Sequence, residues 1–138
     1  SPDVPAEAPA SGPRVYPDSG LAVFRTSWEP DALWGLFVAE QGDARKTLHD
    51  HVDGTSFSMA AYGEYLLMDT GYYKPNGLDN AVTAHADSHN VILVDGQGAP
   101  DKGLLTNFGD ADATLENSRD GERLAWSEAH QSYEEVDI

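Results

Sequence analysis

The sequence contains no cysteine, so any site formed by this chain is not thiolate-based. Basic residues are also scarce: 8 Lys and Arg stand against 24 Asp and Glu, a formal net charge of −16. Such a surface repels nucleic acid and anionic lipid, which excludes both as general partners. No apolar run approaches the ~20 residues that a membrane helix needs, and no signal-peptide pattern opens the chain. If the protein is exported, we expect its signal to lie outside this sequence.

What the sequence does contain is typical of one globular domain. The 138 residues are 40% hydrophobic and 23% charged, which fits a folded chain with a single core. Residues 1–13 are dominated by Pro, Ala and Ser. We therefore interpret residues 1–14 as a linker or the remnant of an upstream domain, and residues 15–138 as the folded domain.

Short strand-like runs follow one another along this domain, and no segment sustains a helical period over ten residues. Turn dipeptides or tetrapeptides separate several runs, such as Ala61-Tyr62-Gly63-Glu64, Asp95-Gly96 and Asp120-Gly121. This spacing predicts an all-β fold, an antiparallel β-sandwich or barrel. The predicted strands cover 21–27, 32–39, 55–61, 65–69, 89–94, 113–116 and 123–127.

Four polar residues in three blocks, each at the end of one of these runs, are candidates for a metal site. His49 and His51 stand two residues apart before one run, so in an extended backbone both imidazoles project to the same side. Asp69 ends the next run and His89 opens a later one. Imidazoles and a carboxylate gathered from neighbouring strands are ligands that suit zinc.

Each of these residues also has a more ordinary interpretation. A single histidine is more often a surface or satisfied core residue than a ligand, and an HxH pair is common by chance. Asp69 precedes Thr-Gly, where an aspartate usually caps a turn through its own backbone. His89 could equally be a turn residue. The ordered set is therefore a stronger signal than any member.

Four blocks in order resemble the heparinase II/III-like polysaccharide lyases over about residues 20–97. The first is a strand with a central arginine, Ala22-Val23-Phe24-Arg25, and the second is an HxHxD-like block that runs from His49 to Phe57. The third is an Ala-Tyr-Gly hairpin followed by Leu-Leu-x-Asp-x-Gly, from Ala61 to Gly71. The last is Ser-His-Asn with Val-Asp-Gly-Gln, ending at Gln97. The family often carries an arginine shortly before Ser-His-Asn, where this chain has His85 nearby.

The resemblance implies a β-sandwich, a site and an activity. It implies one zinc ion held by His51, Asp69 and His89 with a water, and a catalytic His49 that faces the substrate cleft. The implied reaction is β-elimination on a uronic acid within an acidic polysaccharide. Family sandwiches usually continue well past the position of Ile138, so the chain resembles part of a larger lyase of the periplasm or the secreted fraction.

Most catalytic groups of the family sit on a preceding helical toroid domain, which becomes the expected partner of this chain. The chain alone is therefore expected to be inactive. Its acidity should itself repel an anionic polysaccharide unless a metal and a basic partner domain offset it. A simpler interpretation, which we favour, is that the acidity maintains solubility in salt, where exposed charges are screened beyond about 10 Å.

Two alternatives use other classes of function. A cupin-like metal enzyme would need an acid after the HxH pair, but the expected position holds Thr55 or Ser56, and Asp53 comes too early. A non-catalytic carbohydrate-binding or structural sandwich would use exposed aromatics as sugar-stacking platforms. The candidates for that role are Trp28, Trp34, Tyr72 and Tyr73, although core packing is the expected role of the tryptophans.

Overall fold

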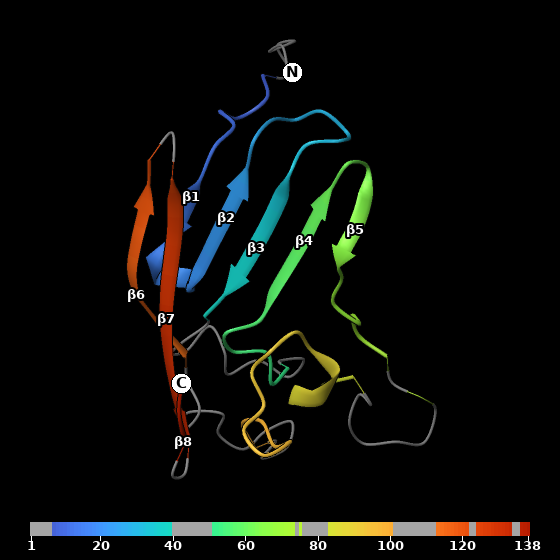
Figure 1. The fold of residues 1–138 in the computed structure, drawn as a ribbon, viewed down its shortest axis with the longest axis vertical. Helices are drawn as coiled ribbons and strands as arrows, with labels where there is room; N and C mark the ends of the chain where they lie inside the picture. Colours follow the sequence, from blue (N-terminus) through green and yellow to red (C-terminus); the bar gives the residue numbers. More distant parts are fainter. Residues whose placement is uncertain are drawn as a thin grey trace, which may run out of the picture.

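The fold consists of two antiparallel sheets joined by irregular segments (Figure 1). The computed structural model describes residues 7–39, 51–73, 75, 83–100, 113–121, 124–133 and 136–138. The first sheet has the strand order β1-β2-β3-β4-β5 and the second has the order β6-β7-β8. The first contains β1 (Arg14–Tyr16), β2 (Leu21–Arg25), β3 (Trp34–Val38), β4 (Phe57–Ala61) and β5 (Glu64–Leu67). The second contains β6 (Ala113–Asp120), β7 (Ala125–Tyr133) and β8 (Val136–Asp137).

The first sheet is a meander, and two of its turns have the backbone geometry that a reversal needs. Gly20, with φ of 64°, ends the short 3-10 helix η1 (Pro17–Ser19) and turns the chain from β1 into β2. Tyr62 and Gly63 both have positive φ, 58° and 77°, as a two-residue type I′ turn requires. The predicted Ala61–Glu64 hairpin is therefore confirmed as the β4–β5 connection.

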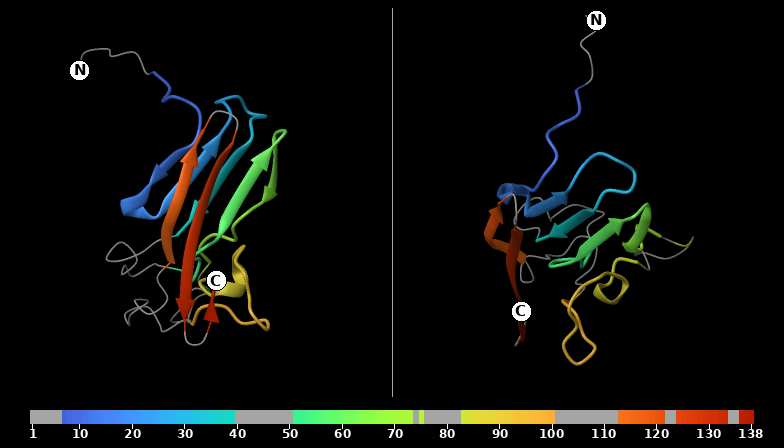
Figure 2. Two further views of the ribbon diagram at one scale, coloured as in Figure 1. Left: turned by 60° about the vertical axis from the view of Figure 1, so that its left-hand side comes forward. Right: turned by 45° about the horizontal axis from the view of Figure 1, so that its top comes forward.

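The second sheet lies beside β1 and crosses one part of the first sheet (Figure 2). Most buried apolar side chains of the described residues are small, namely Ala22, Ala39, Ala61, Ala86 and Ala113. The larger ones are Val52, which packs with Ala86, and Tyr133 on β7, which is 5% exposed. Large apolar groups near β5 stay in solvent, with Tyr65 71% and Met68 66% exposed. The predicted all-β sandwich is confirmed, and it is an incompletely covered, partial one. Within the described ranges no helix is long and apolar enough to cross a membrane.

One predicted strand is wrong. Residues 89–94 do not join a sheet; they follow the 3-10 helix η3 (Ala86–Ser88) as irregular chain that ends in an isolated bridge between Val94 and Gln97. The bridge encloses the predicted Asp95-Gly96 turn, in which both residues have positive φ. An apolar run favours a strand only when a neighbouring strand can accept its N–H groups, and Ile92 is instead 61% exposed. The short strands β1 and β8 were not predicted, because two or three residues carry no measurable period.

The other strand predictions are confirmed with shifted ends. β2, β3, β4 and β5 lie within the predicted runs to within one or two residues, while β6 and β7 extend several residues beyond theirs. The added residues come from the long β6–β7 pairing, which continues from Ala113 opposite Gln131 to Asp120 opposite Ala125. Polar residues such as Asn117 and Ser118 join a strand here because the partner strand accepts their backbone hydrogen bonds.

Gly54 holds the loop before β4 close to the second sheet, which leads to a stability prediction. A Cβ at this position would meet the Nε2 atom of buried Gln131 and would lie 3.2 Å from the Cβ of Ala113. We expect Gly54→Ala to lower the free energy of unfolding by about 1–3 kcal/mol through overpacking. Gly35→Ala is the matched control because its Cβ would have no neighbour closer than 3.8 Å. Urea unfolding of both variants measures the difference; equal stability would contradict the proposed contact.

Candidate metal centre

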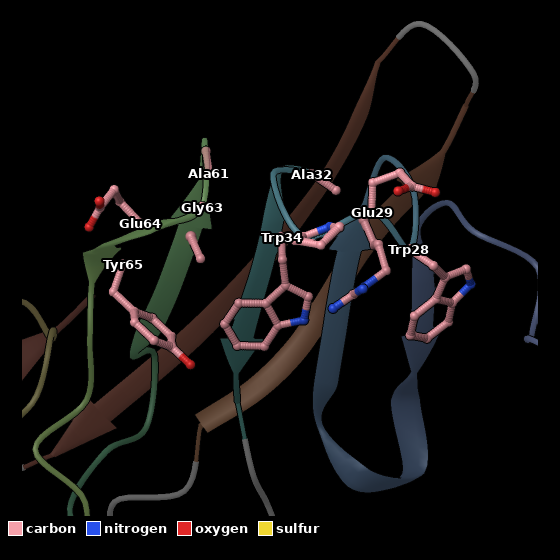
Figure 3. A pocket seen from close by; sticks show the side chains of 11 residues that line it. Trp28, Glu29, Ala32, Trp34, Ala61, Gly63, Glu64 and Tyr65 are labelled. Atoms are coloured by element: carbon pink, nitrogen blue, oxygen red, sulfur yellow. The ribbon is translucent and has the colours of Figure 1, made fainter.

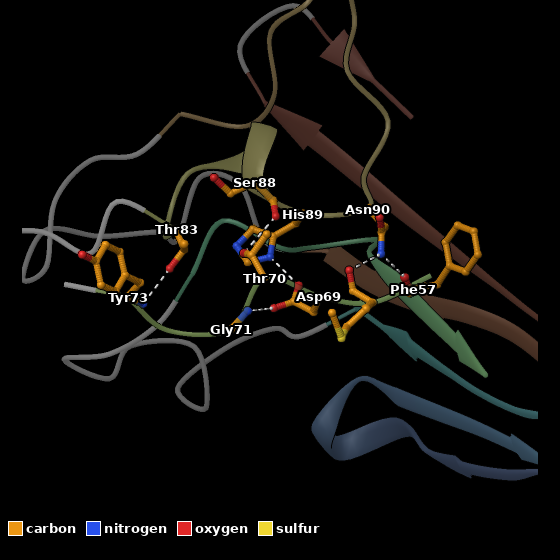
Figure 4. A network of polar contacts seen from close by, with 10 residues as sticks. Phe57, Asp69, Thr70, Gly71, Tyr73, Thr83, Ser88, His89 and Asn90 are labelled. Carbon is orange, nitrogen blue, oxygen red and sulfur yellow. Dashed lines mark hydrogen bonds and ion pairs between the residues drawn. The ribbon is translucent and has the colours of Figure 1, made fainter. Parts of the chain in front are cut away.

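The three residues predicted to hold a metal come together at one end of the first sheet. His51 lies in the loop before β4, Asp69 follows the end of β5, and His89 follows η3. Because β4 and β5 are antiparallel neighbours, the start of β4 and the end of β5 lie at the same edge. Figure 4 shows Asp69 and His89 meeting there, on segments distant in the sequence. His49 lies outside the described residues, so its predicted catalytic role stays a prediction.

Asp69 and His89 form the closest polar contact of this site. The Nδ1 atom of His89 and the Oδ2 atom of Asp69 are 2.6 Å apart, and the His89 side chain is fully buried. An ionised carboxylate can only accept, so Nδ1 carries the proton and Nε2 carries the lone pair of the neutral ring. That Nε2 atom is buried and has no hydrogen-bond partner. The structure therefore presents a buried imidazole nitrogen without a hydrogen bond, and in the neutral ring this atom carries the lone pair that a metal ion binds.

The carboxyl group of Asp69 is held in its ionised form. Partial burial opposes ionisation, but the hydrogen bonds from His89 and from the backbone N–H of Gly71 outweigh it, so the pKa of Asp69 is lowered from its usual value. The Gly71 nitrogen lies 2.8 Å from Oδ1. This bond also confirms the ordinary turn-capping role considered for Asp69, because the aspartate binds the backbone two residues ahead.

His51 completes a cluster of rings around His89. The centroid of its ring lies 5.1 Å from that of His89. The Tyr72 ring stacks on His51, with 5.7 Å between the two centroids and an interplanar angle of 21°. The stack restricts the orientation of the His51 ring. Tyr72 was considered in the sequence only as a sugar platform, since nothing in a single sequence indicates which ring an aromatic residue contacts.

Backbone contacts from the same segments hold the cluster in place. The side-chain amide of Asn90 donates to the carbonyl oxygen of Phe57 at 3.0 Å, which ties the segment after η3 to the start of β4. The hydroxyl of Thr70 donates to the carbonyl oxygen of Ser88 at 3.0 Å, which ties the end of β5 to η3 (Figure 4). Asn90 and Thr70 stand beside predicted site residues, but the sequence assigned neither of them a role.

The donor set fits a zinc-type ion in chemistry, although the residues are arranged as a hydrogen-bonded cluster. In the part of the chain that the structure describes, no three His, Asp or Glu side chains are spaced to hold a metal as they stand. The reason is that Asp69 contacts Nδ1 of His89 at 2.6 Å, whereas the unpartnered atom is Nε2 on the far side of the same ring, so the carboxylate and Nε2 do not face one common point. The buried Nε2 of His89, a second imidazole and an ionised carboxylate are nevertheless the donors that zinc prefers.

A second feature lies at the opposite end of the sheet. Trp28, 51% exposed, and half-buried Trp34 line a cleft of about 560 Å³ together with Tyr65 (Figure 3). The expectation that the tryptophans serve as core packing is therefore wrong for Trp28. Its loop, between β2 and β3, projects beyond the sheet, where the Arg25 guanidinium lies over one face of the ring. Tyr72 and Tyr73 are also exposed, at 49% and 60%, but they lie with the metal candidates.

Comparisons with known proteins agree on the fold. Among solved structures, a heparinase III matches 90% of this chain with a TM-score of 0.68 and 19% identity, over 18% of its own length. A second heparinase III structure matches 90% with a TM-score of 0.66 and 19% identity, over 19% of its length. The heparan sulfate lyase HepC from Pedobacter heparinus matches 91% with a TM-score of 0.68 and 17% identity, over 18% of its length. No curated protein sequence gives a significant match.

The chain thus spans less than a fifth of the length of each of these three lyases. The family model described as heparinase II/III-like, C-terminal matches residues 8–137, nearly the whole sequence. This match excludes the cupin-like alternative. The chain belongs to the heparinase II/III-like C-terminal family.

Proposed function

We propose that this chain is the metal-binding β-sandwich part of a polysaccharide lyase that cleaves uronate-containing polysaccharide by β-elimination. The observation that carries the proposal is the meeting of Asp69, His89 and His51 at one end of the sheet, in a chain of this family. In the reaction a base removes the C5 proton of the uronate, the C4–O bond breaks as a C4=C5 double bond forms, and the leaving oxygen takes up a proton.

We further propose that His51, Asp69 and His89 would hold one zinc-like ion. Such an ion would supply positive charge where an acidic substrate binds, which matters in a chain of formal net charge −16. Other residues at this end of the sheet position the proposed ligands. Asp69 faces the Nδ1 edge of His89, Tyr72 orients His51, and the Asn90 amide keeps the segments together. His49 is proposed to face the substrate as acid, base or carboxylate partner.

The proposed partners are the acidic polysaccharide and a helical toroid domain of the same protein, and the proposed location is the periplasm or the secreted fraction. The two proposed partners are supported by the family membership and by the small fraction of the heparinase structures that this chain spans. The proposed location follows from the family resemblance alone.

Activity tests the proposal directly. Incubated alone with alginate or heparan-type polysaccharide, this chain is expected to release no unsaturated uronate ends, because the proton-abstracting groups are proposed to lie on the helical domain. Joined to that domain, the same chain is expected to restore lyase activity. Absorbance of the unsaturated product measures both results. Robust turnover by the isolated chain would place the active site within these 138 residues and contradict the proposal.

A further inference from the structure

The cleft at the end of the sheet remote from His89 is built by strand register. Arg25 pairs with Trp34, Trp34 with Ala60, and Ala60 with Tyr65. Residues directly opposite each other on antiparallel strands project to the same face, so these four side chains form one row across β2, β3, β4 and β5. The row places the small methyl of Ala60 between two rings. This leaves the hollow of about 560 Å³ (Figure 3).

The Trp28 ring of the cleft is held in place before any ligand arrives. The indole N–H of Trp28 donates to the carbonyl oxygen of Pro9 at 2.6 Å, and the Arg25 guanidinium lies 4.3 Å above the Trp28 ring. Arg25 in turn donates to the carbonyl oxygen of Ser27 at 3.4 Å. An exposed ring fixed on one edge and one face loses little freedom on binding, which favours affinity. Figure 3 shows Tyr65, Trp34 and Trp28 following one another across the cleft.

The charges of the cleft decide between classes of ligand. One positive charge, on Arg25, stands against two negative charges, on Glu29 and Glu64, and the whole chain carries −16. A uronate or sulfated chain would therefore gain no net attraction here. A cationic ligand would compete with Arg25, which already occupies the face of Trp28. Uncharged sugar rings avoid both penalties: their apolar faces stack on aromatic rings, and their hydroxyls match the guanidinium and carboxylate groups.

We propose that this cleft binds an uncharged stretch of oligosaccharide, separately from the metal end of the sheet. β4 begins at Phe57, which contacts Asn90 beside His89, and ends at Ala61 beside the cleft. Four steps along the strand separate the two ends by roughly 13 Å. The sandwich would thus hold a glycan at a position that takes no part in bond cleavage. Neither a bound metal nor turnover is needed, so this proposal and the proposed function can fail independently.

Calorimetric titration of the 138-residue chain with cellotetraose tests the cleft, with a galacturonate trimer as the anionic comparison. We expect millimolar binding of cellotetraose, at least tenfold weaker binding of the galacturonate trimer, and no change on adding a chelator. Tyr65→Ala removes a ring that is 71% exposed and should weaken binding roughly five- to tenfold without altering the melting temperature. Trp34→Ala should weaken binding as much, and Ala60→Leu should do so by filling the hollow.

Trp126→Ala is the matched control, because Trp126 is 39% exposed on β7, in the other sheet. It should leave the affinity for cellotetraose within twofold of the original. Absence of cellotetraose binding, equal affinity for the galacturonate trimer, or equal losses in Tyr65→Ala and Trp126→Ala would each overturn the proposal. So would a dimer, seen by sedimentation, that Tyr65→Ala dissociates, since the cleft would then be an interface between copies of this chain.

Discussion

Replacing His89 with alanine is expected to abolish zinc binding and to remove the stabilisation that zinc gives. His89 contributes the one imidazole nitrogen in the described cluster that is known to be buried without a partner. The His89 side chain is also fully buried against Asp69, so its loss leaves that carboxylate without its closest partner. At zinc concentrations about 100-fold above Kd, bound metal stabilises a fold by about 2.7 kcal/mol, or roughly 10 °C in melting temperature.

Elemental analysis after mild dialysis, together with melting curves with and without zinc, measures both effects. The unaltered chain should carry one zinc ion and melt higher in its presence, whereas His89→Ala and His51→Ala should do neither. His85→Ala is the control: His85 is exposed and lies outside the proposed ligand set. A chain that binds no metal before any substitution would contradict the assignment of His51, Asp69 and His89 to zinc, and so would equal metal loss in the His85 variant.

In the complete lyase, His49→Ala is expected to lower kcat by about 10²–10⁴-fold, the range typical of a lost general acid or base. Metal content and melting temperature should stay unchanged, because the resemblance places His49 at the substrate and His51 at the metal. His51→Ala should lose metal as well as activity. The paired measurement separates the two roles, which a rate alone does not.

Two results would contradict the separate roles proposed for His49 and His51. Equal metal loss in His49→Ala and His51→Ala would show that both side chains ligate. An unchanged kcat in His49→Ala would show that His49 is an incidental residue. In either case the proposed substrate site near the metal would have to be built from other side chains.

Much of the architecture could be predicted because it depends on local pattern. The Tyr62-Gly63 turn has positive φ at both residues, and such a turn can be recognised from its sequence alone. Short runs between turns likewise predicted β2 to β5. The run at 89–94 was mispredicted because a strand also needs a partner, and hydrogen bonding between distant segments leaves no local signal.

The sequence by itself determined the all-β class, the family, and the identity of His51, Asp69 and His89 as residues to examine together. Only the tertiary structure decided how they meet. It set the Nδ1 edge of His89 against Asp69, left the Nε2 atom buried, and stacked Tyr72 on His51. It also aligned Trp34, Ala60 and Tyr65 in one row, which forms the cleft at the other end of the sheet. These relations depend on strand register and on contacts between residues far apart in the chain, which periodicity and composition do not encode.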